Sequence, residues 1–215
     1  MKPLRDCRLY TFVDCAYLRG RDPKMVTQQL CDGGSDLIQL RAKDHTRDEI
    51  RRMAEAILPI TQRAGVGLVI NDFLAVASET GAPYCHLGQE DFFDAGHTHV
   101  SQLKGSGSSV QIGLSSHEPE QARRAVAAGA AYVAIGPIFA TRTKPGAVPV
   151  TVDYARWAAE NIAIPWFAIG GINLETVDAV LAAGARRICV VSAILNRDDV
   201  AQACREFKEK LLGCD

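Results

Sequence analysis

The sequence lacks an excess of charge of either sign, a long apolar run and any paired cysteine motif. Its 215 residues carry 24 Lys and Arg against 25 Asp and Glu, whereas a nucleic-acid-binding chain usually gathers a basic excess on one face. No apolar run reaches the roughly 18 residues that a membrane-spanning helix requires. The charged amino-terminal segment also lacks the apolar core of a signal peptide. These absences predict a chain that binds neither nucleic acid nor membrane.

The seven cysteines are odd in number and scattered, and none forms a C-x-x-C pair. This pattern is typical of reduced thiols in a cytosolic protein rather than of a disulfide framework or a zinc site. The chain also has no G-x-S-x-G elbow and no Walker loop. We therefore expect a cytoplasmic protein whose chemistry uses neither motif.

What the sequence does contain is a regular alternation of short apolar runs with longer amphipathic stretches. The runs predict strands over residues 9–13, 37–40, 67–70, 84–87, 110–113, 132–135, 166–169 and 187–191. The stretches predict helices over residues 23–31, 46–64, 74–78, 118–128, 153–160, 174–183 and 198–212. Residues 89–109 are expected to be irregular, with one helical turn. The chain thus divides into eight units of a strand followed by a helical or irregular segment.

Eight such units in 215 residues leave about 27 residues for each, which is enough for a strand, two short loops and a helix. The strands are apolar on both faces, as buried parallel strands are. These features predict an α/β fold, a single-domain (β/α)8 TIM barrel over residues 1–215. The alternative, an open doubly wound sheet, normally has a Gly-rich turn after its first strand. The residues after Val13 offer no such turn.

The active site of a barrel lies at the carboxyl ends of its strands, and polar residues concentrate there in this sequence. Gln39, Arg41 and Lys43 alternate at the end of the second strand, so their side chains are expected to point the same way. The remaining strand ends carry Asn71-Asp72, His86 to Asp91, Gly113 to His117, Gly136 to Lys144, Gly170-Gly171-Ile172 and Val191-Ser192-Ala193.

A phosphate site is predicted after the seventh and eighth strands. Gly170-Gly171 and the turn at Ser192 stand where many barrels bind phosphate with backbone amides and a short helix. The structural alternative is that Gly171 only relieves crowding at a strand end.

A second anion site is predicted from Arg41, Lys43 and Lys144 together with Asp72 and Asp91. Two carboxylates would repel a single anion, but they suit a Mg²⁺ ion that bridges them to a diphosphate. The alternative is that these five charges form salt bridges at the rim of the barrel.

The ordered set of strand-end motifs resembles the thiamine phosphate synthase family from Leu9 to about Leu195. The resemblance rests on Gln39-Leu40-Arg41-Ala42-Lys43, Asn71-Asp72, His86 to Asp91, Gly136 to Phe139, Thr141 to Lys144, Ile169 to Ile172 and Val191 to Ile194. The family joins hydroxymethylpyrimidine diphosphate to a thiazole phosphate and releases pyrophosphate. It is thought to ionise the C–O bond of the diphosphate first, which needs Mg²⁺ but no enzyme nucleophile.

The resemblance also implies a role for each residue of the site. Asp72 and Asp91 would ligate Mg²⁺, and Arg41, Lys43, Lys144 and Ser115 would be catalytic. The pyrimidine diphosphate would be held by Gln39, Arg41, Lys43, Asn71, Ser115 and Lys144. The thiazole phosphate would be held by Thr141, Thr143, Gly171, Val191 and Ser192.

Three other functions stay open at this point. Thiazole tautomerases share the fold and the thiazole phosphate pocket, but they are expected to use a histidine near the position of Pro137. They would not need the residues of the diphosphate site, which are Arg41, Lys43, Asp72 and Asp91. A barrel without catalytic activity could bind a phosphorylated metabolite as a regulator. A sugar-phosphate epimerase or isomerase would need an acid/base pair across the barrel mouth. The sequence leaves open whether the thiazole is carboxylated and whether the chain forms a homo-oligomer.

Overall fold

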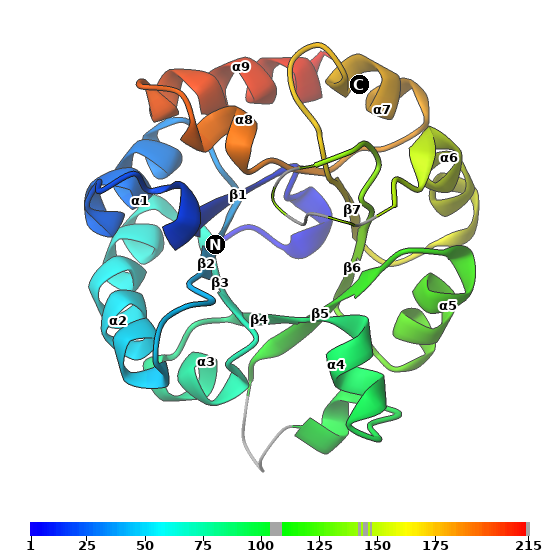
Figure 1. The fold of residues 1–215 in the computed structure, drawn as a ribbon, viewed down its shortest axis with the longest axis horizontal. Coiled ribbons are helices and arrows are strands. Elements are labelled where there is room, and N and C mark those ends of the chain that lie inside the picture. The colour runs from blue at the N-terminus through cyan, green and yellow to red at the C-terminus, as the bar shows by residue number, and fades with distance from the viewer. Residues whose placement is uncertain (104–108, 142, 144–145, 147, 214–215) are drawn as a thin grey trace.

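Eight parallel strands close into a barrel in chain order, and helices surround it (Figure 1). The computed structural model describes residues 1–103, 109–141, 143, 146 and 148–213. Each strand pairs with the next in parallel, and β8 pairs with β1. The predicted (β/α)8 fold is therefore confirmed. No helix in the described ranges is long and apolar enough to span a membrane.

The strands and helices follow the predicted order. The strands are β1 (Leu9–Asp14), β2 (Leu37–Arg41), β3 (Gly67–Asn71), β4 (Tyr84–Leu87), β5 (Gln111–Ser116), β6 (Tyr132–Ile135), β7 (Trp166–Ile169) and β8 (Ile188–Cys189). The α-helices are α1 (Pro23–Asp32), α2 (Arg47–Ala64), α3 (Leu74–Thr80), α4 (Gln89–Asp94), α5 (Pro119–Ala127), α6 (Thr151–Asn161), α7 (Val177–Ala182), α8 (Ser192–Leu195) and α9 (Val200–Leu212). Short 3-10 turns span Leu4–Asp6, Cys15–Tyr17 and Val100–Leu103.

Local side-chain bonds set several of these boundaries. Thr46 and Glu49 form the capping box that the sequence predicts at the start of α2, with the Thr46 amide 2.8 Å from Glu49 Oε2,. The helix predicted over residues 174–183 begins later, at Val177, because Asn173 Oδ1 accepts the amides of Glu175 and Thr176 at 2.8 and 3.0 Å. In that turn the two amides find a side-chain acceptor, so they do not need the carbonyl acceptors of a helix.

Three further differences bear on the site. Residues 89–94, which were expected to be irregular, form α4 directly after β4. Strand β5 extends beyond its predicted end to Ser116, so Ser115 lies within the strand. Strand β8 is reduced to two residues, and α8 begins three residues later at Ser192.

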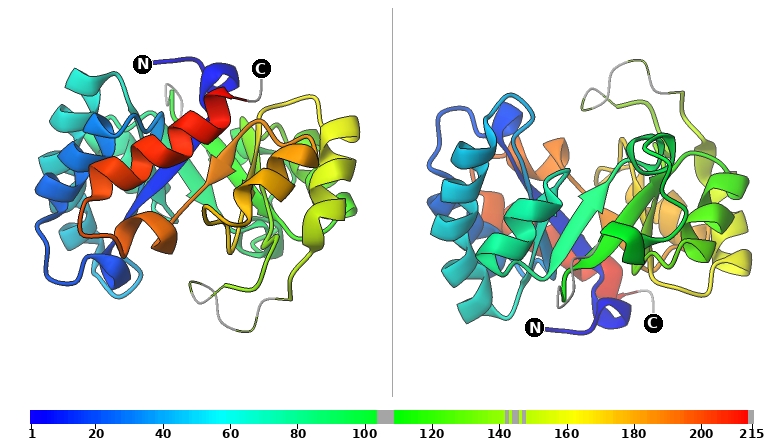
Figure 2. Two further views of the ribbon diagram at one scale, coloured as in Figure 1. Left: turned by 90° about the horizontal axis from the view of Figure 1, so that it is seen from above. Right: turned by 90° about the horizontal axis from the view of Figure 1, so that it is seen from below.

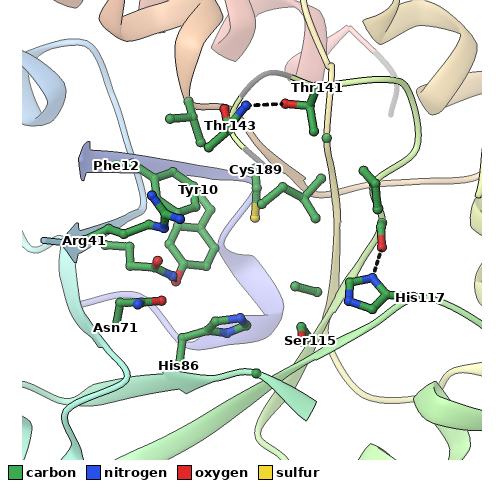
Figure 3. Close-up of a pocket in the computed structure, with 18 of the residues that line it drawn as sticks. Tyr10, Phe12, Arg41, Asn71, His86, Ser115, His117, Thr141, Thr143 and Cys189 are labelled. Atoms are coloured by element: carbon green, nitrogen blue, oxygen red, sulfur yellow. Dashed lines mark hydrogen bonds between the residues drawn. The ribbon is translucent and has the colours of Figure 1, made fainter. Parts of the chain in front are cut away.

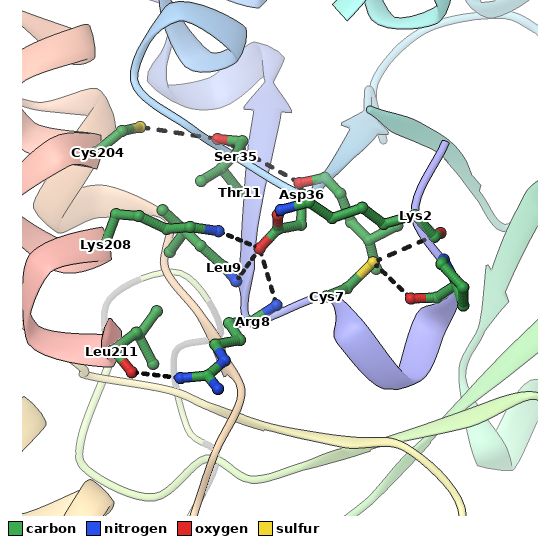
Figure 4. Close-up of polar contacts among 12 residues, drawn as sticks. Lys2, Cys7, Arg8, Leu9, Thr11, Ser35, Asp36, Cys204, Lys208 and Leu211 are labelled. Atoms are coloured by element: carbon green, nitrogen blue, oxygen red, sulfur yellow. Dashed lines mark hydrogen bonds and ion pairs between the residues drawn. The ribbon is translucent and has the colours of Figure 1, made fainter. Parts of the chain in front are cut away.

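The first residues of the chain and the end of α9 meet at the end of the barrel opposite the site (Figure 2). The side chain of Asp36 is only 2% exposed there and holds these segments together (Figure 4). It accepts from Lys2 Nζ at 2.7 Å, from the amides of Arg8 and Leu9 at 2.8 and 3.0 Å, and from Lys208 of α9.

Candidate active site

A cavity of about 340 Å³ opens at the carboxyl ends of the strands (Figure 3). The predicted site residues that the structure describes all line it: Gln39, Arg41, Lys43, Asn71, Asp72, Asp91, Ser115, Thr141, Thr143, Gly171, Val191 and Ser192. Lys144 lies outside the described residues. The residues that the sequence distributes over seven strand ends are thus brought to one cavity.

Arg41 is paired within the protein. Its Nη1 lies 2.8 Å from Oδ2 of Asp14, whose side chain is 2% exposed at the end of β1. Asp14 Oδ1 also accepts the amide of Ala16 at 3.1 Å, which fixes the carboxylate. Because β1 and β2 pair with Asp14 opposite Arg41, the guanidinium is held against the wall of the cavity. Arg41 is therefore in a salt bridge, but with Asp14, which is not one of the five charges that the alternative pairs with each other.

Asp72 has a backbone conformation that favours glycine, with φ of 65°. Its amide donates to the carbonyl of His86 at 2.9 Å, and its Oδ2 accepts from Asn71 Nδ2 at 2.6 Å. A residue other than glycine costs about 1–3 kcal/mol in such a conformation and is often found at functional sites. These bonds keep the Asp72 carboxylate at the cavity.

The charge of Asp91 acts on the carboxylate of Asp72. Partial desolvation raises the pKa of Asp72, and the charge of Asp91 raises it further, while Lys43 and Arg41 lower it. Asp91 is in the first turn of α4 and lies over Gly88, where an added Cβ would meet Asp91 Oδ2 at 2.5 Å. The two acidic side chains are thus close enough for the charge of one to raise the pKa of the other, as like charges do,.

Ser115 connects this acidic pair to the barrel. Its Oγ accepts the amide of Gln89, the first residue of α4, at 3.0 Å. Because that bond uses an oxygen lone pair, the hydroxyl proton of Ser115 is left to donate to a ligand.

The opposite side of the cavity is formed by the loops after β6, β7 and β8. Gly171 has φ of +65°, and a Cβ there would lie 2.6 Å from the carbonyl oxygen of Ala140. Glycine at position 171 therefore relieves crowding, as the structural alternative expects. Gly171 also lines the cavity. Thr141 Oγ1 accepts the amide of Thr143 at 3.2 Å, and Thr143 Oγ1 is 3.1 Å from the hydroxyl of Tyr17.

The floor of the cavity is polar, with Tyr10, Gln39 and Tyr132 buried and His86 half-buried. Gln39 Nε2 lies 2.6 Å from the Tyr10 hydroxyl, which lies 3.0 Å from the Tyr132 hydroxyl. His86 Nδ1 is 3.1 Å from the same Tyr132 hydroxyl. Burial lowers the pKa of His86 to about 4 and raises the pKa of both tyrosines well above their usual value. All four side chains are thus neutral near pH 7.

Comparison with known proteins identifies the family. A family model described as thiamine monophosphate synthase matches residues 9–194. The chain belongs to the thiamine monophosphate synthase family. It is 41% identical over 195 residues to a thiamine-phosphate synthase of Thermus thermophilus, with 87% of this chain and 88% of the relative covered. It is 38% identical over 206 residues to one of Halalkalibacterium halodurans, with 95% of each chain covered.

A solved structure supports the same family. A thiamine phosphate pyrophosphorylase from Pyrococcus furiosus matches with a TM-score of 0.86 and 25% sequence identity, over 99% of each chain.

In this member of the thiamine monophosphate synthase family, sequence reasoning missed the contribution of β1. Tyr10 and Phe12 line the cavity, and Asp14 holds Arg41. The rule that placed Gln39 and Arg41 on one side of β2 also applies to residues 10, 12 and 14. The predicted strand ends at Val13, before Asp14, and Tyr and Phe are ordinary core residues, so the sequence carries no local signal for these three.

Proposed function

We propose that this chain joins hydroxymethylpyrimidine diphosphate to a thiazole phosphate, forming thiamine phosphate and pyrophosphate, and that residues 1–215 act as one catalytic domain. The proposal rests on one observation. A single cavity is lined on one side by cationic and acidic side chains and on the other by glycine and hydroxyl groups, in a chain of this family. The first side suits a metal diphosphate and the second suits a monophosphate. A reaction between two phosphorylated substrates needs both sides in one cavity.

Arg41, Lys43 and Lys144 hold the leaving pyrophosphate in this proposal, and Ser115 donates to it. Breaking the C–O bond places negative charge on the leaving oxygen, so fixed cations and hydroxyl donors lower the barrier. The buried pair with Asp14 supports this role for Arg41, because it holds the guanidinium in one orientation before substrate binds. Gln39 and Asn71 bind the pyrimidine ring.

Asp72 and Asp91 fit a Mg²⁺ site. Both are oxygen ligands at one cavity, and the charge of one raises the pKa of the other. Mg²⁺ is commonly held by one or two carboxylates together with substrate phosphates. A bound Mg²⁺ supplies neutralising charge to the diphosphate.

Thr141, Thr143, Gly171, Val191 and Ser192 bind the thiazole phosphate in this proposal. Hydroxyl and backbone donors bind a phosphate without a formal charge. The bond between Tyr17 and Thr143 ties the loop after β6 to the segment after β1 and keeps the threonine at the cavity.

No residue needs to act as a nucleophile. Cys189 lines the cavity, but burial raises the pKa of its thiol well above the usual value. The thiolate is the reactive form of cysteine. Cys189 is therefore an apolar wall for the positively charged pyrimidine intermediate, from which water has to be excluded.

The test is to incubate the purified protein with both substrates and Mg²⁺ and to quantify thiamine phosphate and pyrophosphate in equal amounts. Parallel reactions with the carboxylated and the decarboxylated thiazole phosphate identify the substrate form. The matched control is Asp91→Asn, which keeps the size of the side chain but removes its charge and is expected to abolish turnover at ordinary Mg²⁺ concentrations. Absence of product where the Thermus thermophilus relative is active would overturn the proposal.

A further inference from the structure

Arg21, in the loop between β1 and α1, holds two segments that are far apart in the sequence. Its half-buried side chain donates to the backbone carbonyls of Leu18 at 2.9 Å, Tyr17 at 3.1 Å, Arg197 at 3.3 Å and Leu195. A guanidinium has only N–H donors, arranged in a planar fork, and no acceptor, so the direction of all four bonds is fixed. Arg21 is not among the residues that line the cavity. Its bonds therefore hold backbone.

The first two carbonyls belong to a tight turn that folds Arg21 back over its own loop. The amide of Arg21 donates to the carbonyl of Leu18 at 3.0 Å, and the intervening Arg19 and Gly20 have φ of 55° and 80°. Positive φ at both central positions is the pattern of a type I′ turn. An arginine is disfavoured in this conformation and keeps it only when its surroundings hold it there. The bonds from the Arg21 side chain are part of those surroundings.

The other two carbonyls are at the end of α8. Leu195 is the last residue of this helix, and Arg197 follows two positions later. The last carbonyls of a helix have no partner within it, and an arginine side chain is a common donor to them. Arg21 therefore joins the loop after β1 to the end of α8, across 174 positions of the sequence.

Both segments lead to the glycine- and hydroxyl-lined side of the cavity. The helix α8 is only four residues long and begins at Ser192, which lines the cavity. The Tyr17 hydroxyl lies 3.1 Å from Oγ1 of Thr143, which also lines the cavity and is seen there in Figure 3. One side chain outside the cavity thus fixes the backbone of Ser192 and the backbone of the residue that is bonded to Thr143.

We propose that Arg21 is a positioning residue for the thiazole phosphate: by holding the loop after β1 against the end of α8, it sets the spacing of Thr143 and Ser192. The inference rests on the proposed function for the identity of the ligand. The clamp, meaning the four bonds from Arg21, is a property of the free protein. Loss of the clamp should leave the pyrimidine diphosphate side unaffected, because that side is built on β2, β3 and α4.

The first test separates the two substrates. Steady-state assays give the KM for each substrate, and calorimetry gives the affinity for thiazole phosphate alone. In Arg21→Ala the KM for thiazole phosphate should rise by about tenfold or more, the value of one hydrogen bond to a charged group. The KM for the pyrimidine diphosphate and kcat at saturating thiazole phosphate should change by less than about twofold, as expected when only the binding of one substrate is weakened.

Two variants distinguish positioning from charge. Arg21→Lys keeps the positive charge, but one ammonium group does not reproduce the planar fork that spans the four carbonyls, so the KM for thiazole phosphate should rise as in Arg21→Ala. This variant gives the answer if Arg21→Ala does not fold. Arg19→Gly removes the neighbouring exposed charge, which makes one long bond to the carbonyl of Asn196 at 3.4 Å. Glycine suits the positive φ of that position, so the KM should stay at the wild-type value.

Two further variants test the path from Arg21 to the cavity. Tyr17→Phe removes only the link to Thr143 and should raise the KM for thiazole phosphate by a smaller factor. Combined with Arg21→Ala it should add little, because both changes release the same loop. Arg187→Ala is the control for general destabilisation, since Arg187 donates to the carbonyl of Arg5 at 2.6 Å and precedes β8 at the opposite end of the barrel. It should keep both KM values.

The second test reads the clamp without any ligand. In hydrogen exchange followed by mass spectrometry, Arg21→Ala should speed the exchange of amides in residues 15–21 and 192–197 by about tenfold or more, while α5 exchanges as in wild type. Unchanged exchange in both segments, an unchanged KM for thiazole phosphate, full rescue by Arg21→Lys or an equal rise in both KM values would overturn the inference. Failure of the proposed function appears differently: wild type itself would bind no thiazole phosphate, while the exchange rates would still decide whether Arg21 holds the two segments.

Discussion

Asp36→Ala provides a demanding test of how the barrel is closed. The carboxylate accepts two backbone amides, and removing it leaves the buried amide of Leu9 without its side-chain acceptor. It also pairs with Lys208, whose side chain is 17% exposed, and with Lys2, whose side chain is 57% exposed. A hydrogen bond to a charged group contributes about 1.5–3 kcal/mol, whereas an exposed pair such as that with Lys2 adds about 0–1 kcal/mol.

Asp36→Ala should therefore lower the free energy of unfolding by about 4 kcal/mol, within the range of about 3–5 kcal/mol for breaking a buried ion pair. For a chain of this length about 1 kcal/mol shifts Tm by roughly 2–4 °C, so Tm should fall by about 8–16 °C. Urea unfolding followed by circular dichroism measures the free energy, and calorimetry measures Tm. The control is Asp178→Ala, which removes a pair of exposed side chains with Lys210 and should cost less than about 1 kcal/mol.

The pH dependence has a definite sign. Although burial alone would raise it, the pKa of Asp36 is lowered by hydrogen bonds from Lys2, Lys208 and the two amides. The stabilisation is therefore complete above the unfolded pKa near ~4 and is lost as the pH falls through the lower folded value. The difference between wild type and Asp36→Asn should shrink below about pH 4. A loss no larger than that of Asp178→Ala at pH 7, or a difference that grows in acid, would refute this account.

Three predictions concern the cavity. Removing Mg²⁺ with EDTA should weaken binding of the pyrimidine diphosphate, measured by calorimetry, by about 100-fold or more, because a divalent cation offsets several kcal/mol of charge repulsion. Equal affinity with and without Mg²⁺ would contradict the assignment of Asp72 and Asp91. Asp14→Asn should lower kcat/KM for the pyrimidine diphosphate by about tenfold, since Arg41 loses a charge-assisted bond. The KM for thiazole phosphate should stay the same. A change confined to the KM for thiazole phosphate would exclude a role of Asp14 in holding Arg41 for the diphosphate. Ser192→Leu should chiefly raise the KM for thiazole phosphate in steady-state assays, and a selective loss of pyrimidine affinity would reverse the two sides of the cavity.

Periodicity was enough to predict the order of the strands, because each run of apolar residues fits a strand buried on both faces. It did not predict α4, since Gln89 to Asp94 carry few of the apolar repeats that mark a helix. There the helix start is set by tertiary contact, through the bond from the Gln89 amide to Ser115 on the neighbouring strand. Contacts between strands distant in the sequence, such as that between Tyr10 and Tyr132, are likewise invisible to a local pattern.

The charges at the cavity bear on how the proposed diphosphate would be held. Among the described residues that line it, the cations Arg41 and Lys43 share the cavity with the three acidic residues Asp72, Glu90 and Asp91. Asp14, immediately behind this surface, further neutralises Arg41. With Lys144 as the third cation of the proposed site, a free diphosphate would meet three cations opposed by these three carboxylates. A divalent cation reverses that balance, because it is attracted by the same carboxylates that repel the phosphate oxygens. In the proposed function, the acidic side chains would therefore make binding of the diphosphate conditional on the metal, which an entirely basic cavity would not do.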